Sequence, residues 1–410
     1  MSFEENLSKY AKLIVKAGVN VQPGQIVVID APVENANLAR LITKEAYLQG
    51  AGEVVVRYSD EVVSRYKYEY LPTEKFADVP DWFASFRNDY AKENAAFIII
   101  ESSNPEALKG IDPKKIALWS KSVNQACKPF YDGMDLGNNP WCIVAASSLK
   151  WANKVYPDMS DQEAITALWQ AIFKASKVID DDPIDTWQKH RHSFEKRVNY
   201  LNNLNLKTLR YTNSLGTDLT VTLNDEYVFA GGGSYTNKGI YYFPNIPTEE
   251  IFTSPYRNGT NGVVYSSLPL NYNGNLINNF KLVFKDGKIV DFDCETGKDV
   301  LEAIINIDEG SRYLGEIALV PYDSPISNLK TLFYNTLYDE NAACHLALGK
   351  GFSECIKDGL SLNKEQLLEK GINDSLTHVD FMIGTSDLKI VGVTNDSQEV
   401  LIFENGNFVF

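Results

Sequence analysis

The first half of the chain alternates short apolar segments with amphipathic ones. Apolar residues that recur every three or four positions predict helices, whereas short apolar runs bounded by turn residues predict strands. Strands that alternate with helices form parallel sheets with helices on both faces. The predicted strands are 24–32, 53–60, 94–105 and 141–148, and the predicted helices are 3–18, 35–52, KKIALWSKSVNQACK and 161–178.

The pattern changes at about residue 205. A helix predicted over 183–203 leads into many short strands with Gly and Asn turns, and KDGK in NNFKLVFKDGKIVDFD indicates a hairpin. A chain of 410 residues is too long for one ordinary core. We therefore expect an α/β domain with a parallel sheet over 1–203, and a mainly antiparallel α+β catalytic domain over 204–410.

Composition and charge exclude several classes of protein. The net charge of −15 disfavours nucleic acid or an anionic membrane as the main partner. No segment approaches ~20 uninterrupted apolar residues, and the amino-terminal segment is acidic where a signal peptide is basic. The five cysteines are scattered and form no CxxC pair, as is typical of reduced thiols. We expect a cytoplasmic protein.

A parallel α/β domain suggests nucleotide binding, but the necessary glycines are missing. The sequence after the first predicted strand is DAPVENANLAR, without GxGxxG. The later AGGGS (230–234) opens no predicted helix and has no P-loop lysine. Phosphates need glycines in the turn between strand and helix, where backbone N–H groups reach them. A nucleotide-dependent enzyme is therefore disfavoured.

The four histidines can be weighed one by one. His190 and His192 lie on a charged helix and point about 200° apart, so they cannot bind one ion, and we predict that both are solvated. His378 and Asp380 share one face of a predicted strand. They are a structural pair or a pair of metal ligands. His345 lies in the alanine-rich DENAACHLALGKGF, which we predict to be helical, where a lone histidine is more often a core residue.

Buried-looking carboxylates accompany these histidines. Glu316 lies in the apolar strand YLGEIALVP, where a carboxylate is costly unless it is paired. Glu249 and Glu250 lie side by side in FPNIPTEEIFTSP. Carboxylates mixed with neutral imidazoles suit zinc, cobalt or manganese. One ion needs only three or four of these ligands, whereas five ligands with three carboxylates suit two ions, bridged by a carboxylate and a hydroxide.

The chain resembles the metal-dependent aminopeptidases of the aminopeptidase T and aminopeptidase S (PepS) type over essentially its whole length. The most specific segments are GTDLTVTL (216–223), FPNIPTEEIFTSP (243–255), YLGEIALVP (313–321), NAACHLALGKGF (341–352) and THVDFMIG (377–384). The resemblance implies a dinuclear site with the ligands Glu250, Glu316, His345, His378 and Asp380, and a homodimer. The family places a tyrosine near the metals where this chain has Phe352.

These observations predict a dinuclear metal-dependent aminopeptidase that removes N-terminal residues from short peptides by a metal-bound hydroxide. Glu250 or Glu316 is expected to carry the proton to the leaving amine. The alternative is a non-catalytic peptide- or metabolite-binding protein on the same scaffold, with Phe352 marking lost chemistry.

The adjacent glutamates are expected to differ. Neighbouring residues on a strand face opposite ways. Glu250 then faces the metals with Phe252 and Ser254, whereas Glu249 lies at the rim, behind the ligands or at the surface.

Overall fold

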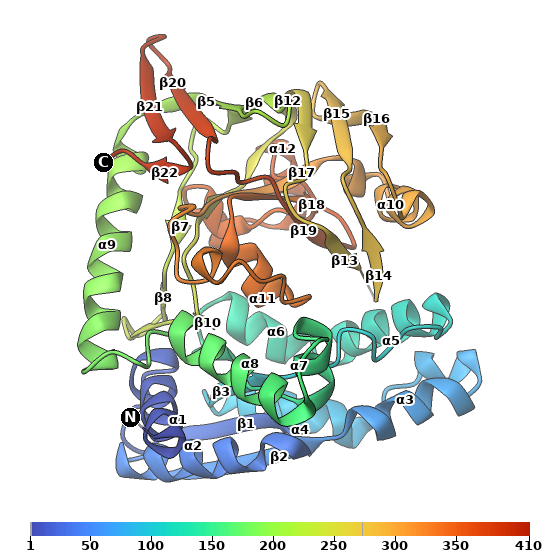
Figure 1. The fold of residues 1–410 in the computed structure, drawn as a ribbon, viewed down its shortest axis with the longest axis vertical. Helices are drawn as coiled ribbons and strands as arrows, with labels where there is room; N and C mark the ends of the chain where they lie inside the picture. Colours follow the sequence, from blue (N-terminus) through green and yellow to red (C-terminus); the bar gives the residue numbers. More distant parts are fainter. Residues whose placement is uncertain (1, 273) are drawn as a thin grey trace. The chain divides into compact units, whose positions relative to one another are not determined.

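A computed structural model describes residues 2–272 and 274–410 (Figure 1). The chain forms two compact units. The first contains the residues up to Lys189 together with Gly233–Pro247, and the second contains His190–Gly232 together with Thr248–Phe410. The predicted division into domains at residue 203 stays a prediction.

The first unit contains a five-stranded parallel sheet in the order β10-β4-β3-β1-β2. Its strands are β1 (Ile26–Pro32), β2 (Glu53–Ser59), β3 (Ala96–Glu101), β4 (Trp141–Ala145) and β10 (Asn245–Ile246). The four strands predicted from the first half are confirmed. The fifth, β10, comes from the second half of the sequence and was missed, because a two-residue strand has no periodicity to detect.

Helices cover both faces of this sheet. Val28 and Phe97 pack on one face with Ala91 and Phe130. Val27 and Ile29 point to the other face and are fully buried. The helices of this unit are α1 (Phe3–Leu13), α2 (Ala36–Leu48), α3 (Glu61–Tyr70), α4 (Asp81–Lys92), α5 (Pro113–Ala126), α6 (Lys128–Asp135), α7 (Leu149–Val155) and α8 (Asp161–Ala175). A π-helical turn, Ile14–Gly18, extends α1, and a short ribbon, β8 (Ser234–Tyr235) and β9 (Tyr241–Tyr242), completes the unit.

Polar side chains fill the place where the strand order of the parallel sheet reverses. Open α/β sheets bind ligands at this position, outside the carboxyl ends of the strands. Asn35, which follows β1, is buried and donates from Nδ2 to the carbonyl of Ser147, which follows β4, at 3.0 Å. Ser102, which follows β3, donates from Oγ to Asn35 Oδ1 at 2.6 Å. These neutral groups satisfy one another.

The second unit contains two larger antiparallel sheets. The eight-stranded sheet has the order β16-β15-β12-β6-β5-β20-β21-β22, and Figure 1 shows the red strand β20 beside the green strand β5. Its strands are β5 (Leu206–Thr212), β6 (Asp218–Leu223), β12 (Pro255–Tyr265), β15 (Lys281–Lys285), β16 (Lys288–Asp293), β20 (Lys389–Thr394), β21 (Glu399–Glu404) and β22 (Asn407–Phe408). The predicted KDGK hairpin joins β15 to β16.

The five-stranded sheet of this unit has the order β19-β18-β17-β11-β7. Its strands are β7 (Ala230–Gly231), β11 (Ile251–Thr253), β17 (Leu314–Leu319), β18 (His345–Gly349) and β19 (His378–Met382). The other elements are the ribbon β13 (Leu270–Tyr272) and β14 (Asn275–Ile277), the helices α10 (Lys298–Ile305), α11 (Thr336–Asp339) and α12 (Lys364–Glu369), and α9 (Pro183–Asn203), which begins in the first unit.

The predicted helix around His345 is wrong, because these residues form β18. Alanine has the highest helix propensity, and it made the segment look helical. Leu346 and Leu348 nevertheless alternate with His345 and Ala347, which is the two-residue period of a strand. Pairing with β17 and β19 on either side stabilises this period.

Among the helices within 2–272 and 274–410, none combines the length and the apolar character needed to cross a bilayer.

Candidate metal centre

The five predicted ligands come together on the five-stranded sheet of the second unit. Glu316 lies on β17, His345 on β18, and His378 and Asp380 on β19. Glu250 immediately precedes β11. The strands are neighbours in the sheet, so segments more than a hundred residues apart in sequence meet at one place.

The alternation of the strands separates these ligands from the core. Successive strand residues point to opposite faces. One face belongs to a buried apolar cluster shared with the eight-stranded sheet, and its residues include Ile251, Ile317, Leu319, Leu346, Leu348, Val379 and Phe381. The predicted ligands occupy the other face. The carboxylate of Glu316 lies in an apolar strand because one face of this sheet packs in the core and the other carries the predicted ligands.

Register places two carboxylates on either side of an alanine. Ala347 pairs with Glu316 on one neighbouring strand and with Asp380 on the other. Directly paired residues have Cβ atoms about 4.5–5.5 Å apart on the same face. The methyl group of Ala347 is small, so it leaves space between the two carboxylates.

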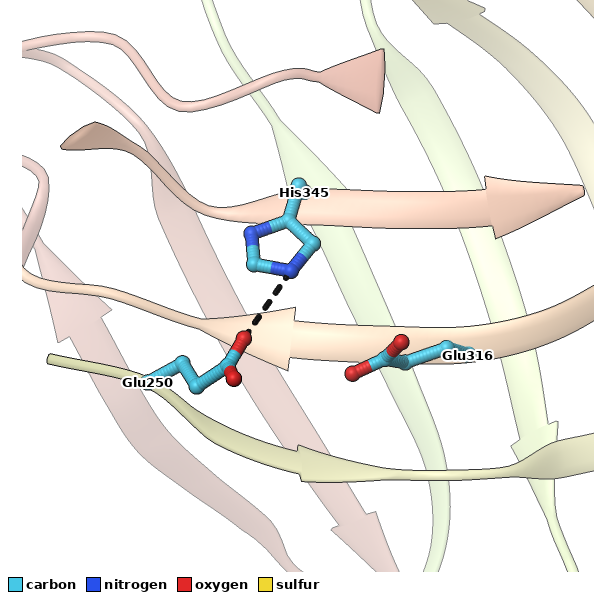
Figure 2. A group of neighbouring side chains, drawn as sticks. All are labelled: Glu250, Glu316 and His345. Atoms are coloured by element: carbon cyan, nitrogen blue, oxygen red, sulfur yellow. Dashed lines mark ion pairs between the residues drawn. The ribbon is translucent and has the colours of Figure 1, made fainter. Parts of the chain in front are cut away.

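Glu250, Glu316 and His345 form the first cluster. One ligand atom of each lies within 4.8 Å of the others. His345 Nε2 is 3.2 Å from Glu250 Oε2, and Figure 2 shows the carboxylates of Glu250 and Glu316 pointing toward one another beside the imidazole. Nδ1 of His345 lies 3.1 Å from the carbonyl oxygen of Ala343.

Glu316, His378 and Asp380 form the second cluster, with the same 4.8 Å spacing. His378 Nε2 lies 3.0 Å from Glu316 Oε2 and 3.1 Å from Asp380 Oδ1. Its Nδ1 lies 2.7 Å from the carbonyl oxygen of Lys350. Glu316 thus belongs to both clusters.

Both imidazoles are oriented as metal ligands are. A carbonyl oxygen only accepts, so Nδ1–H donates in both His345 and His378. Each Nε2 then points toward carboxylates. Metal-ligating histidines almost always donate their other ring N–H in this way, which fixes the tautomer. The donor set therefore fits divalent ions.

The crowding of charge shifts the pKa values of these groups. Burial disfavours charge on His345, but the hydrogen bond and charge of Glu250 outweigh it and raise its pKa to about 10. Burial likewise opposes charge on His378, but Asp380 and Glu316 raise its pKa well above 6.5. Burial, together with the charges of Glu250 and Asp380, raises the pKa of Glu316 to about 6.

Glu340 is a residue of this region that the sequence analysis missed. Burial, followed by the charges of Glu250 and Asp380, raises the pKa of its carboxyl group well above 4.5. His345 and Glu316 also act on it. It follows α11 and begins the short 3₁₀ helix Glu340–Ala342, in a segment that we predicted to be helical, and nothing in that segment set its carboxylate apart.

The two adjacent glutamates precede β11 instead of lying on the predicted strand, yet they have different surroundings, and Glu249 is not at the surface. Its exposed fraction is 5%, and its Oε2 lies 3.7 Å from Nε2 of His190. The prediction that His190 is solvated is wrong. Its side chain is only 11% exposed, and its Nε2–H donates to the carbonyl of Thr248 at 2.8 Å. His192 is exposed, as predicted.

Phe352 packs beside the second cluster. Its ring centroid lies 5.0 Å from that of His378 and 5.5 Å from that of Phe252. The residue where the resemblance implies a tyrosine is therefore in contact with a predicted ligand.

Comparisons with known proteins identify the family. A model of the thermophilic metalloprotease family (M29) matches residues 3–408. The chain is 46% identical over 409 residues to aminopeptidase AmpS of Bacillus subtilis (strain 168), with 100% of both chains covered. It is also 46% identical to aminopeptidase 2 of Geobacillus stearothermophilus, covering 100% of this chain and 98% of that one. The structure of wild-type AmpT from Thermus thermophilus matches with a TM-score of 0.93 at 35% identity, covering 100% of both chains.

The chain belongs to the thermophilic metalloprotease family (M29). The predicted family resemblance and the predicted enzyme class, a metallo-aminopeptidase, are confirmed. Membership of a metalloprotease family implies the use of divalent metal. The ligand set, the number and identity of the ions, the homodimer and the cytoplasmic location stay predictions.

Proposed function

We propose that the protein uses two divalent ions to hydrolyse the N-terminal peptide bond of short peptides. The observation that carries this proposal is the sharing of Glu316 by two ligand clusters. A carboxylate has two oxygens and can bridge two ions, as in dinuclear aminopeptidases. The proposed ligands are Glu250, Glu316, His345, His378 and Asp380.

The charge of the donor set supports two ions. Three carboxylates and two neutral imidazoles carry three negative charges. Two divalent cations and one hydroxide offset them, which leaves the neutral cluster that a buried site tolerates best. Oxygen and imidazole donors suit zinc, cobalt or manganese, so the proposal does not choose among these three.

The chain has to hold the ligands and move a proton. Bound divalent ions in such sites activate water as the nucleophile and polarise the scissile carbonyl. A carboxylate then delivers a proton to the leaving amine. Glu250 and Glu316 were expected in this role. We propose Glu340 as a third candidate, because the charges of both clusters act on its carboxyl group and, among the described residues, it is a member of neither cluster.

Replacement of Glu340 by Gln tests the proton carrier. The amide has the same shape and cannot exchange a proton, so turnover should fall about 10²–10⁴-fold while metal content stays unchanged. Loss of metal together with activity would make Glu340 a ligand, and unchanged turnover would return the role to Glu250 or Glu316.

Peptides with a free N-terminus are the proposed substrates, since the relatives are named aminopeptidases. The α-amine would bind at the clusters or pair with a nearby carboxylate, which places the first peptide bond at the reacting centre. We keep the homodimer, which rests on the family resemblance, and the cytoplasm, the predicted compartment, as proposals.

Metal content and activity, measured together, test the function. Purified protein should hold about two transition-metal ions per chain and should lose hydrolysis of amino-acid p-nitroanilides after chelation. Glu250→Gln should cost metal and activity, whereas the matched Glu249→Gln should cost far less. Saturable peptide binding without release of free amino acid would favour the non-catalytic alternative.

A further inference from the structure

The residues just before β11 lie outside regular strand pairing. Thr248, Glu249 and Glu250 have no helix or strand assignment, and β11 begins at Ile251. Glu250 therefore lacks the rigid ladder that holds the ligands of β17, β18 and β19. Its position depends on whatever fixes this short segment.

Asn341 fixes the segment from one side. It is fully buried, and its Oδ1 accepts from the backbone N–H of Glu249 at 2.7 Å. Its Nδ2 donates to the carbonyl of Leu337 at 2.9 Å and lies 3.4 Å from Glu340 Oε1. The Glu249 amide adjoins Glu250 along the chain, so this hydrogen bond orients the backbone that carries the Glu250 carboxylate.

Asn341 also leads into the His345 segment. Ala343, two residues beyond Asn341, supplies the carbonyl that receives His345 Nδ1–H. One buried amide thus connects the backbone segments of Glu250 and His345, two of the three members of the first cluster. The residues specific to the second cluster, His378 and Asp380, are held by the β18–β19 ladder and by the Lys350 carbonyl.

His190 fixes the same segment from the other side. Its Nε2–H donates to the Thr248 carbonyl at 2.8 Å, and its ring packs against Phe194 with centroids 4.6 Å apart. The backbone on the amino-terminal side of Glu250 is therefore held at two consecutive residues by side chains from two different elements.

We infer that Asn341, assisted by His190, is a positioning residue that sets metal affinity at the first cluster and leaves the second cluster unaffected. The inference rests on the proposed dinuclear function. Side chains that orient ligands typically change metal affinity by about 10–100-fold. Only the first cluster depends on the Asn341 hydrogen bond, so the loss should be confined to one of the two ions.

Zinc titration of metal-free full-length protein tests the inference. Isothermal calorimetry with Zn²⁺, together with metal content after dialysis, separates the two sites. Wild type should bind about two ions, and Asn341→Leu, which keeps the branched shape and removes both the acceptor and the donor, should weaken one of them about 10–100-fold. Asn139→Leu is the matched control, because Asn139 is fully buried and donates to the carbonyls of Ala91 and Ala95 in the first unit. It should leave both sites intact.

The His190 variants keep the inference testable if Asn341→Leu fails to fold. His190→Phe removes the N–H donor and should weaken the same single site, whereas His190→Gln retains a donor and should restore affinity. Equal weakening of both sites, or no weakening in folded Asn341→Leu and in His190→Phe, overturns the inference. A wild-type protein that binds no Zn²⁺ overturns the proposed function and, with it, this inference.

Discussion

The two units each bury a polar cluster, and the clusters differ in kind. At the carboxyl ends of the parallel strands, Asn35 and Ser102 are neutral, and the hydrogen bonds among these side chains satisfy them. On the five-stranded antiparallel sheet, carboxylates and imidazoles crowd together, and burial and charge shift their pKa values. Buried polar groups cost free energy unless they are partnered. The neutral cluster of the parallel sheet is complete by itself, whereas the carboxylates and imidazoles of the antiparallel sheet carry excess negative charge that suits cations.

Replacement of the shared carboxylate should produce the largest effect. Glu316→Gln removes a charged ligand from both clusters, so affinity for both ions and kcat/KM should fall by more than about 100-fold. Metal content and p-nitroanilide hydrolysis measure this loss. Loss of one ion alone would mean that Glu316 does not bridge.

The affinity for metal should depend on pH, because the proposed ligands of the antiparallel sheet titrate. The raised pKa of about 10 keeps His345 protonated at neutral pH in metal-free protein, and a ligand must lose that proton. Affinity should therefore rise about tenfold per pH unit for each proton released. Calorimetry in buffers of different ionisation enthalpy counts the protons.

The stability of metal-free protein should follow the opposite course. The pKa of His345 is raised in the folded protein, so its contribution to the free energy of unfolding is complete below its pKa in the unfolded chain, about 6.5. It is lost as pH rises through about 10. Urea unfolding at several pH values measures it, and a metal-free protein that gains stability across this window would contradict the assignment.

Filling the space between the carboxylates should have an intermediate effect. Ala347→Val adds bulk between Glu316 and Asp380, so metal affinity should fall, with overpacking costing about 1–3 kcal/mol. Metal titration and thermal unfolding separate the two losses. Ala164→Val on α8, where Ala164 is fully buried in the first unit, is a control for overpacking alone.

The smallest effect is expected in the neutral cluster of the parallel sheet. Ser102→Ala leaves Asn35 Oδ1 without its hydroxyl donor and should lower the free energy of unfolding by about 1–3 kcal/mol. Metal content and turnover should not change. A loss of activity at unchanged stability would give this cluster a functional role.

Local periodicity allowed much of the fold to be predicted. Four strands of the parallel sheet, and β17 and β19, were visible as apolar or alternating runs, because each is long enough to show a period. β18 and β10 were among the strands that were not visible. Alanine suits a helix as well as a strand, which hid β18, and β10 is too short to carry a pattern.

The site was predictable only in part. Residue types alone left Glu249 and Glu250 unresolved, and the family resemblance selected Glu250. Glu340 and the buried environment of His190 were missed because both depend on contacts between distant segments. Helical periodicity indicates which way His190 points on α9, but it cannot reveal the Thr248 carbonyl that accepts a hydrogen bond from the imidazole.

The alternation of ligands and core residues on β17, β18 and β19 makes correct strand pairing a condition for chemistry. A slip of one residue in register would turn His345, Glu316 and Asp380 into the apolar interior and expose the leucines. A misaligned strand is therefore penalised twice, by buried charge and by lost apolar contact. Chains with a wrong register in this sheet should be too unstable to complete the fold. Nearly every chain that folds should therefore also have an assembled ligand set.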